Sequence, residues 1–322
     1  EYNGNRHSVS HFSSVKFVVP ATNYYNFTGK ALLMDNYRFV DAGARIVDNN
    51  KQTDRYLVGV RGQTDDGWDW ESAASYSVAE AFDVTHNRVS NTLMDALLHR
   101  TDETAYNPFN GAGVYQTGFV SHNPVDYTPG GIGPAIVDAY RANERTMTTL
   151  DFRMSKPDVF TITGGDVGMA FGVEARNDTF MDDRDPRLDG TIVFTERRTD
   201  GQLSTSAGDT YPYVSDLANS SPTPDSDGAR NVNSVYIEFD VPLVSPEMNI
   251  PVVEQFDLQL AYRQEAYSDF EGTGVPRVAF GWVVNDILKI RGSQQDTFRA
   301  PNMITINAVS YTHLRAHETA RH

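Results

Sequence analysis

Alternation of apolar and small or polar residues is clearest in Val167-Gly-Met-Ala-Phe-Gly-Val-Glu-Ala-Arg176. Apolar side chains occupy every second position, and glycine, alanine, glutamate or arginine stands between them. Because side chains two positions apart lie on the same face of a β-strand, this pattern predicts a strand with one apolar and one polar face.

The same alternation recurs along the chain. It predicts further strands within residues 55–61, 68–78, 150–154, 234–241, 256–263, 277–284 and 288–291. Several of these stretches reach about 10 residues, the length that a tilted strand needs to cross a bilayer. Strands of soluble domains are usually nearer 5 or 6 residues. We therefore expect an all-β chain of about 8–10 long antiparallel strands.

The composition excludes several classes of protein. The 322 residues include no cysteine, which excludes disulfide scaffolds, thiolate metal sites and cysteine nucleophiles. The formal net charge is −16 and no cluster of lysine and arginine occurs, so nucleic acid is not expected as a partner. There is no run of about 18 apolar residues that would form a transmembrane helix. Membrane β-strands remain possible, because they alternate and have low mean hydropathy.

The connections between the expected strands alternate between short and long. Residues 64–67 and 284–286 form tight turns, whereas residues 83–147 and 180–230 form connections of a length that is rare in compact soluble domains. Outer-membrane barrels have this asymmetry, with short periplasmic turns and long extracellular loops. One link, residues 268–274, is short where a long one is expected.

Further elements are expected outside the regular strands. Residues 18–53 should contain an extracellular excursion. Within the long loops, residues 90–100 and 134–142 should form short helices, the first with four apolar residues on one side and the second with Pro134 in its first turn. The expected fold is thus an antiparallel transmembrane β-barrel segment, an incomplete barrel whose long extracellular loops contain short helices.

Aromatic residues recur toward the strand ends or on the apolar faces. They are Trp68, Trp70, Tyr76, Tyr262, Tyr267 and Trp282. In a membrane barrel they would form interfacial girdles. In a soluble sheet they would be core aromatics.

No catalytic or metal-binding constellation is complete. Residues 182–185 read Asp-Asp-Arg-Asp, but they lack the spacing of a calcium loop and include an arginine, which favours a solvated loop. In residues 317–322 the second histidine falls one position too late for a zinc-protease motif. We therefore expect no enzyme, no cofactor and no metal, and the ligand-contacting residues stay unassigned.

Several segments resemble the barrels of TonB-dependent receptors. The matching segments are Gly281-Trp282, Leu288–Ser293, Thr297–Asn302, Tyr267–Phe270, Val235–Glu238 with Val241–Leu243, Gly168–Arg176 and Asn107–Asn110. Their order and spacing follow the family over about residues 55–307. The sequence departs from the family at Val284, which replaces a usual proline, at Gln294-Gln295-Asp296, and at Glu271, which precedes the glycine of a hairpin.

The resemblance implies a large barrel with a plug in its lumen, ligand capture by extracellular loops, and uptake energised through TonB. We expect residues 1–307 to be a partial barrel without the plug domain and without the closing strands. Residues 308–322 resemble a translated sequencing adapter, so we expect a non-native tail that gives the His317 motif no weight.

The expected function is energy-coupled uptake of a scarce nutrient, such as a siderophore, a glycan fragment or a cobalamin-like ligand, across the outer membrane. The expected partners are the bilayer, this small ligand and, in the full-length protein, the TonB complex. Loops 83–147 and 180–230 are where ligand contacts are expected. The alternative is a soluble extracellular β-sandwich that binds carbohydrate by stacking on Trp68, Trp70 and tyrosine residues. A sandwich would bury its apolar faces in one closed core, whereas a barrel would point them outward.

Overall fold

The computed structural model describes residues 2–8, 15–35, 37–109, 129–197, 214–220, 222–303 and 306. The chain divides into two compact units that each combine distant parts of the sequence. The first unit comprises Glu1–Gln52, Glu80–Glu144 and Met181–Ser226. The second unit comprises Thr53–Ala79, Arg145–Phe180 and Asp227–His322.

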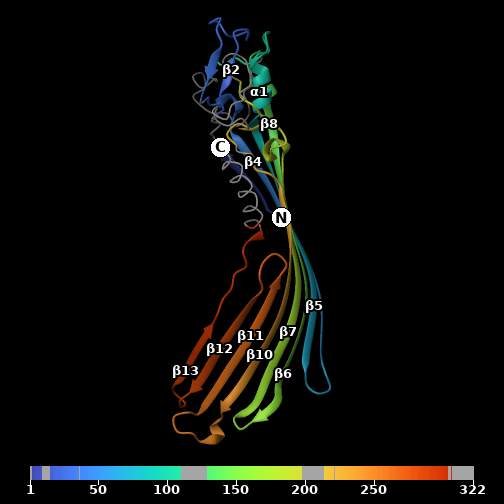
Figure 1. Ribbon diagram of the computed structural model, residues 1–322, viewed down its shortest axis with the longest axis vertical. Coiled ribbons are helices and arrows are strands. Elements are labelled where there is room, and N and C mark those ends of the chain that lie inside the picture. The colour runs from blue at the N-terminus through green and yellow to red at the C-terminus, as the bar shows by residue number, and fades with distance from the viewer. Residues whose placement is uncertain are drawn as a thin grey trace, which may run out of the picture. The chain divides into compact units, whose positions relative to one another are not determined.

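The main sheet of the described residues has nine strands, in the order β1-β4-β5-β6-β7-β10-β11-β12-β13 (Figure 1). The strands are Tyr2–Ser8 (β1), Arg45–Gln63 (β4), Asp69–Val89 (β5), Ile136–Ile162 (β6), Gly165–Arg184 (β7), Ser226–Val244 (β10), Gln255–Tyr267 (β11), Thr273–Val283 (β12) and Lys289–Gln295 (β13). From β4 onward, each strand lies beside the strand that follows it in this sheet. The all-β prediction is confirmed.

Several strands are longer than the alternation indicated. β5 has 21 residues and continues to Val89, and β6 has 27 residues and begins at Ile136. β7 continues to Arg184, and β10 begins at Ser226. The predicted boundaries of both long connections are therefore wrong. The missed parts of β5 and β6 carry polar residues on both faces, so the apolar alternation disappears although the strand continues.

One of the two predicted loop helices forms. α1 spans Asn91–Leu98, and the side chain of Ser90 caps it by accepting a hydrogen bond from the Leu93 amide. The helix predicted at residues 134–142 is wrong. Gly133–Ala135 makes a single 3-10 turn (η3), and β6 begins directly after it. The β-branched Ile136 and Val137 favour a strand at this point.

The predicted tight turns are confirmed. The Gly67 amide donates to the Thr64 carbonyl at 3.0 Å, and Gly67 has a φ of 87°, a conformation that glycine adopts without strain. Between β12 and β13, the Val284 amide donates to the Leu288 carbonyl at 2.9 Å. The link between β11 and β12 is also short, as the sequence indicated.

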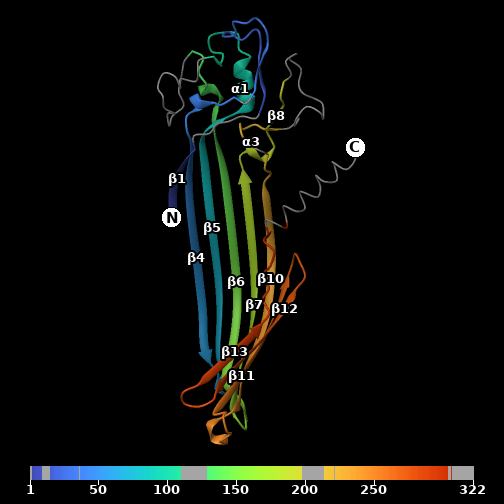
Figure 2. The ribbon, with the colours of Figure 1, turned by 90° about the vertical axis from the view of Figure 1, so that its left-hand side faces the viewer.

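The first unit adds small elements to its share of the strands. They are β2 (Phe17–Val19), β3 (Leu32–Met34), η1 (Val40–Ala42), α3 (Pro186–Asp189), β8 (Val193–Phe194) and β9 (Val214–Ser215); Figure 2 labels α3 and β8 beside α1. Within residues 18–53, where the excursion was predicted, the β2–β3 pair precedes β4, which begins at Arg45.

This unit has an apolar core built from segments far apart in the sequence. Its buried residues are Val15, Phe17, Val19, Met34, Phe39, Ala42, Val89, Met94, Leu97, Leu98, Tyr106, Ile132, Ala135, Phe194 and Ala218. The described parts of three segments, residues 15–42, 89–135 and 194–218, thus pack together instead of lying separately in solvent. Burial of apolar surface on this scale is what fixes otherwise irregular loops.

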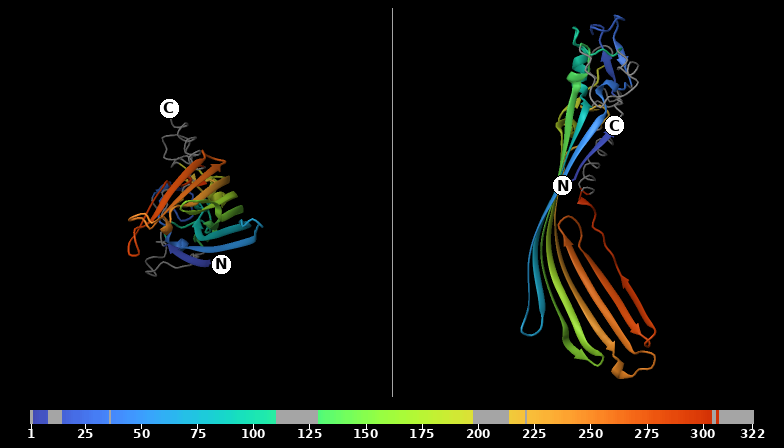
Figure 3. Two further views of the ribbon diagram at one scale, coloured as in Figure 1. Left: turned by 90° about the horizontal axis from the view of Figure 1, so that it is seen from below. Right: turned by 180° about the vertical axis from the view of Figure 1, so that it is seen from behind.

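The described residues of the second unit form strands, turns, the short 3-10 turn η4 (Pro246–Met248) and helical backbone at Met303 and Ile306. Viewed end-on, its strands follow one another along a curved line (Figure 3, left). Among the buried apolar residues of the described chain, only Val167, Phe180, Val232 and Ala279 belong to this unit. No helix in the described segments is long and apolar enough to cross a membrane.

Candidate functional site

Strand register gives the sheet of the second unit two distinct faces. Across β10 and β11, Ile237 pairs with Tyr262 and Phe239 with Leu260. Leu260 also pairs with Val278 on β12. Side chains of paired residues point to the same side of a sheet, so these bulky apolar residues share one face. This apolar face is the one that the alternation predicted.

The apolar face is exposed. Val58 is 73% exposed, Val235 52% and Val278 46%, and no second sheet of described residues covers them. The β-sandwich alternative required a closed core at this point, and the described residues do not form one. A contiguous exposed apolar surface indicates contact with another apolar phase or partner.

Aromatic side chains take part in this face as predicted, with one exception. The rings of Trp68 and Phe171 have centroids 5.9 Å apart, and Trp282 Nε1 donates to the Val252 carbonyl at 3.0 Å. Tyr267 is the exception: it lies at a strand end, as predicted, because it is the last residue of β11. Tyr267 lies on the polar face, where its hydroxyl hydrogen-bonds to the Glu265 carboxylate.

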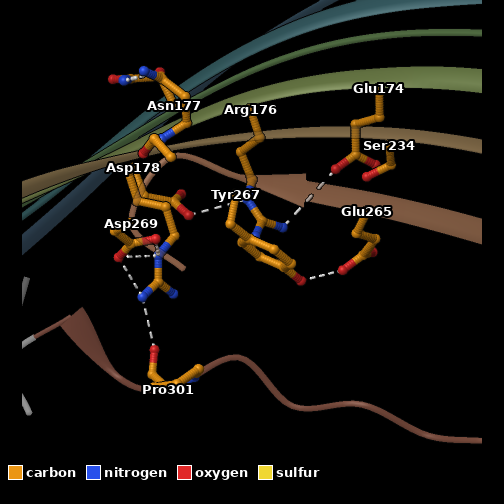
Figure 4. Close-up of polar contacts among 12 residues, drawn as sticks. Glu174, Arg176, Asn177, Asp178, Ser234, Glu265, Tyr267, Asp269 and Pro301 are labelled. Atoms are coloured by element: carbon orange, nitrogen blue, oxygen red, sulfur yellow. Dashed lines mark hydrogen bonds and ion pairs between the residues drawn. The ribbon is translucent and has the colours of Figure 1, made fainter. Parts of the chain in front are cut away.

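The polar face carries a network of ion pairs that links β7, β10 and β11 (Figure 4). Arg263 Nε donates to Glu265 at 2.7 Å, and its Nη2 lies 3.1 Å from Ser234 Oγ and 3.8 Å from Glu174 Oε2. Arg176 lies 3.0 Å from Asp178 and 3.9 Å from Glu174. The charged residues of β7 and β11 and the Ser234 hydroxyl of β10 thus form one connected network, which single-strand alternation could not reveal.

Arg230 forms a separate clamp at the end of this network. Its side chain is 7% exposed and its Nε donates to both oxygens of Asp269, at 2.9 and 2.8 Å. Nη2 donates to the Pro301 carbonyl at 2.9 Å, as Figure 4 shows. The guanidinium also lies 5.8 and 5.0 Å from the ring centroids of Tyr267 and Phe270. Arg230 therefore ties the β11–β12 link and the segment after β13 to β10.

A hollow of about 800 Å³ opens on this unit. Its lining includes Arg61, Trp70, Glu71, Arg153, Tyr236 and Glu238. Arg153 Nη2 donates to Glu71 Oε2 at 2.7 Å, so both signs of charge are present. Such a lining can bind polar groups of a ligand or of another polypeptide.

The first unit brings together the two loops in which ligand contacts were predicted. Ser90 Oγ donates to Asp216 Oδ2 at 2.7 Å, and Asn91 Nδ2 donates to the Ser215 carbonyl at 2.9 Å. Arg187 pairs with the same Asp216 carboxylate, which is fully buried. The loops are therefore joined by a buried polar network as well as by the apolar core.

Burial shifts the pKa of several groups in this unit. Desolvation raises the pKa of Asp41 to about 6, although the Tyr106 hydroxyl donates to its Oδ2 at 3.0 Å. Desolvation also raises the pKa of the neighbouring Tyr37 to about 12. Asp41 Oδ1 has no hydrogen-bond partner among the described residues. Burying these polar groups in the core costs folding free energy.

His86 lies between two carboxylates on adjacent strands. Its Nε2 is 3.0 Å from Asp48 on β4, and its Nδ1 is 2.9 Å from Asp138 on β6. Desolvation lowers the pKa of His86, but the two carboxylates outweigh it, so the pKa lies above its ordinary value. The cationic imidazole is the form that this arrangement favours.

The acidic motif at residues 182–185 is engaged in ion pairs. Asp182 accepts from Arg141 at 2.7 Å and from Arg184 at 2.9 Å. Among the residues that the structure describes, no group of His, Asp or Glu has the arrangement of a metal site. The motif at residues 317–322 lies outside the described residues.

Comparison with known proteins adds no assignment. No protein-family model matches the chain. A search of curated proteins likewise found no match.

Proposed function

We propose that this chain is the barrel region of a TonB-dependent receptor, which takes up a scarce nutrient across the outer membrane. The observation that carries the proposal is the exposed apolar face of the second unit, which lies in strict register opposite a charged face. In a membrane barrel the apolar face contacts lipid and the polar face lines the lumen.

Strand length supports a membrane-spanning role for the second unit. β11 has 13 residues and β12 has 11. At about 3.3 Å per residue, 11 residues extend for about 36 Å. A tilt of about 45° reduces this to about 25 Å, which is the height of the apolar band of an outer-membrane barrel. In this proposal the spanning segments belong to the second unit.

The family resemblance supports the more specific part of the proposal. The matching segments Gly168–Arg176 and Val235–Glu238 lie on the neighbouring strands β7 and β10. The loops that the family uses to capture ligand correspond to the connections of the first unit. In this proposal the first unit receives the nutrient and the second provides the route through the membrane.

A spin-label experiment tests the assignment of the faces. The chain has no cysteine, so each single substitution gives one labelled position. Apolar-face variants are Val235→Cys, Leu260→Cys and Val278→Cys. The matched polar-face variants are exposed positions of the same three strands, Asp240→Cys, Gln259→Cys and Arg277→Cys.

Each variant is produced in a Gram-negative host, and its label is probed in outer membranes. Labels on the apolar face should be accessible to oxygen and shielded from a water-soluble nickel complex. Labels on the polar face should show the reverse. Equal access of the nickel complex to both sets would refute the proposal.

A further inference from the structure

Exposed aromatic side chains gather on two loops of the first unit. Phe27 is 82% exposed, Tyr24 58% and Phe109 44%. The ring centroids of Phe27 and Phe109 are 5.2 Å apart, and those of Tyr24 and Tyr25 are 5.0 Å apart. These four residues are called the aromatic platform. Clusters of large exposed rings belong to binding surfaces more often than to parts of the surface that bind nothing.

Two buried asparagines hold the first loop in place. Asn23 Nδ2 donates to the Leu98 carbonyl at 2.7 Å, and its Oδ1 accepts from the Tyr25 amide at 2.9 Å. Asn26 Nδ2 donates to the carbonyls of Pro20 and Lys30 at 2.9 and 2.8 Å. Tyr24, Tyr25 and Phe27 are thereby fixed to α1 and to the loop itself. Pre-organisation of this kind lowers the entropy cost of binding.

The second loop is fixed against the first. The Tyr25 hydroxyl donates to the Glu103 carbonyl at 2.8 Å. The Asn107 amide donates to the Gly130 carbonyl at 3.0 Å, and Asn107 Oδ1 accepts from the Phe109 amide at 3.0 Å. Gly130 has a φ of 95°, and a Cβ atom there would lie 3.0 Å from the Tyr25 hydroxyl. The close approach of the two loops therefore requires glycine.

The size of the platform favours a small ligand over a protein. A large aromatic side chain can bury about 150–250 Å², so the exposed parts of Tyr24, Phe27 and Phe109 together offer roughly 400 Å². A stable protein interface needs about 800 Å² on each partner. The platform is therefore suited to a ligand of a few rings.

Charge selects among small ligands. The first unit contains 21 acidic and 13 basic residues, which disfavours an anion. The same two loops carry the exposed polar side chains of Thr28, Asp102 and Thr104, which can bind hydroxyl groups. Sugar rings combine an apolar C–H face, which stacks on aromatic rings, with hydroxyl groups at their edge.

We infer that the aromatic platform binds an uncharged oligosaccharide, which makes a glycan fragment the nutrient. This inference rests on the proposed uptake function and deepens it. Phe27, the most exposed ring, provides the main stacking surface.

The test is binding by the whole chain in lauryldimethylamine oxide micelles, which have no sugar headgroup. The probes are maltohexaose, xylohexaose and laminarihexaose, measured by calorimetry and saturation-transfer NMR. We expect at least one of the three to bind. Phe27→Ala and Tyr24→Ala should each raise its Kd about tenfold or more, whereas Phe27→Trp should keep the Kd within about threefold.

Leu33→Ala is the matched control, because Leu33 is an exposed apolar residue of the same unit that lacks a ring. It should leave the Kd unchanged. Near-ultraviolet circular dichroism confirms that each variant is folded, and the two alanine variants give independent readings. Failure of all three sugars to bind would overturn the inference, as would binding that both alanine variants leave unchanged.

The two proposals fail separately. If the sugars do not bind while the spin labels follow the two faces, the inference falls and the membrane assignment stands. If a sugar binds while the water-soluble nickel complex reaches the apolar-face labels, the membrane assignment falls.

Discussion

Several glycines of the second unit lie beneath an aromatic ring. A Cβ atom on Gly172 would lie 2.5 Å from Cε1 of Tyr236, and one on Gly292 would lie 2.5 Å from Cε1 of Phe280. Real Cβ atoms essentially never approach a neighbour this closely. Glycine at these positions lets a ring of the neighbouring strand lie flat against the sheet, which packs an otherwise bare stretch of backbone.

Replacing Gly172 by alanine should therefore destabilise the chain. We expect the free energy of unfolding to fall by about 1–3 kcal/mol, because the Tyr236 ring must leave its position. Urea unfolding in micelles measures the change. Gly281→Ala is the control, since the nearest atoms to its Cβ would be 3.9 Å away. Combining Gly172→Ala with Tyr236→Ala should remove the clash, and full additivity of the two losses would contradict this account.

Asp41 is the residue with the clearest pH signature. Its pKa in the folded protein is about 6, which is above its ordinary value because of desolvation. The folded state therefore binds the proton more tightly than the unfolded state. Stability should be fully retained below about pH 4 and should fall as the pH rises to about 6, by roughly 3 kcal/mol in total.

Asp41→Asn should remove this dependence. The variant should be more stable than the parent above about pH 6 and nearly equal to it below about pH 4. Urea unfolding at a series of pH values gives the comparison. The exposed Asp35 provides a control substitution, Asp35→Asn, that should have little effect. An equal gain at every pH would show that titration of Asp41 is not the cause.

At the scale of elements, alternation located the strands only where bulky apolar residues face one side. It identified the strand around Val167–Arg176, whereas the helical spacing of four apolar residues identified α1. Alternation missed the parts of β5 and β6 in which both faces are polar. Backbone pairing with a neighbouring strand continues there without an apolar pattern, and only the structure reveals that pairing.

The Arg230 clamp joins elements that no local pattern connects. Asp269→Asn would leave a nearly buried guanidinium without its carboxylate. We expect a loss of about 2 kcal/mol in the free energy of unfolding, the range typical of charged hydrogen bonds.

Glu71→Gln is the matched control for the clamp. It breaks the ion pair with Arg153, whose side chain is 59% exposed, and should cost less than about 1 kcal/mol. Equal losses from the two variants, measured by urea unfolding, would show that burial of Arg230 does not matter.

At the scale of the whole chain, the exposed apolar face determines whether the chain stays dispersed in a given solvent. Without detergent or lipid the chain should aggregate, because its apolar face and its strand edges can pair with other copies. In micelles it should be monomeric. Size-exclusion chromatography with light scattering distinguishes these states, and a stable monomer in plain buffer would contradict the expectation.

A set of paired substitutions shows which face is responsible. A triple variant should aggregate less than the parent without detergent; it carries Val235→Thr, Leu260→Thr and Val278→Thr. The same change at Ser234, Gln259 and Ala279 on the opposite face should not reduce aggregation.

The all-β class, the two-faced strands, the tight turns and α1 could be predicted from the sequence. These features depend on side chains two to four positions apart, and such spacing is visible in a linear pattern. The full strand lengths, the shared core of the first unit and the aromatic platform became visible only in the tertiary structure. Each of these depends on which distant segments pack together, and burial, not local spacing, sets that choice.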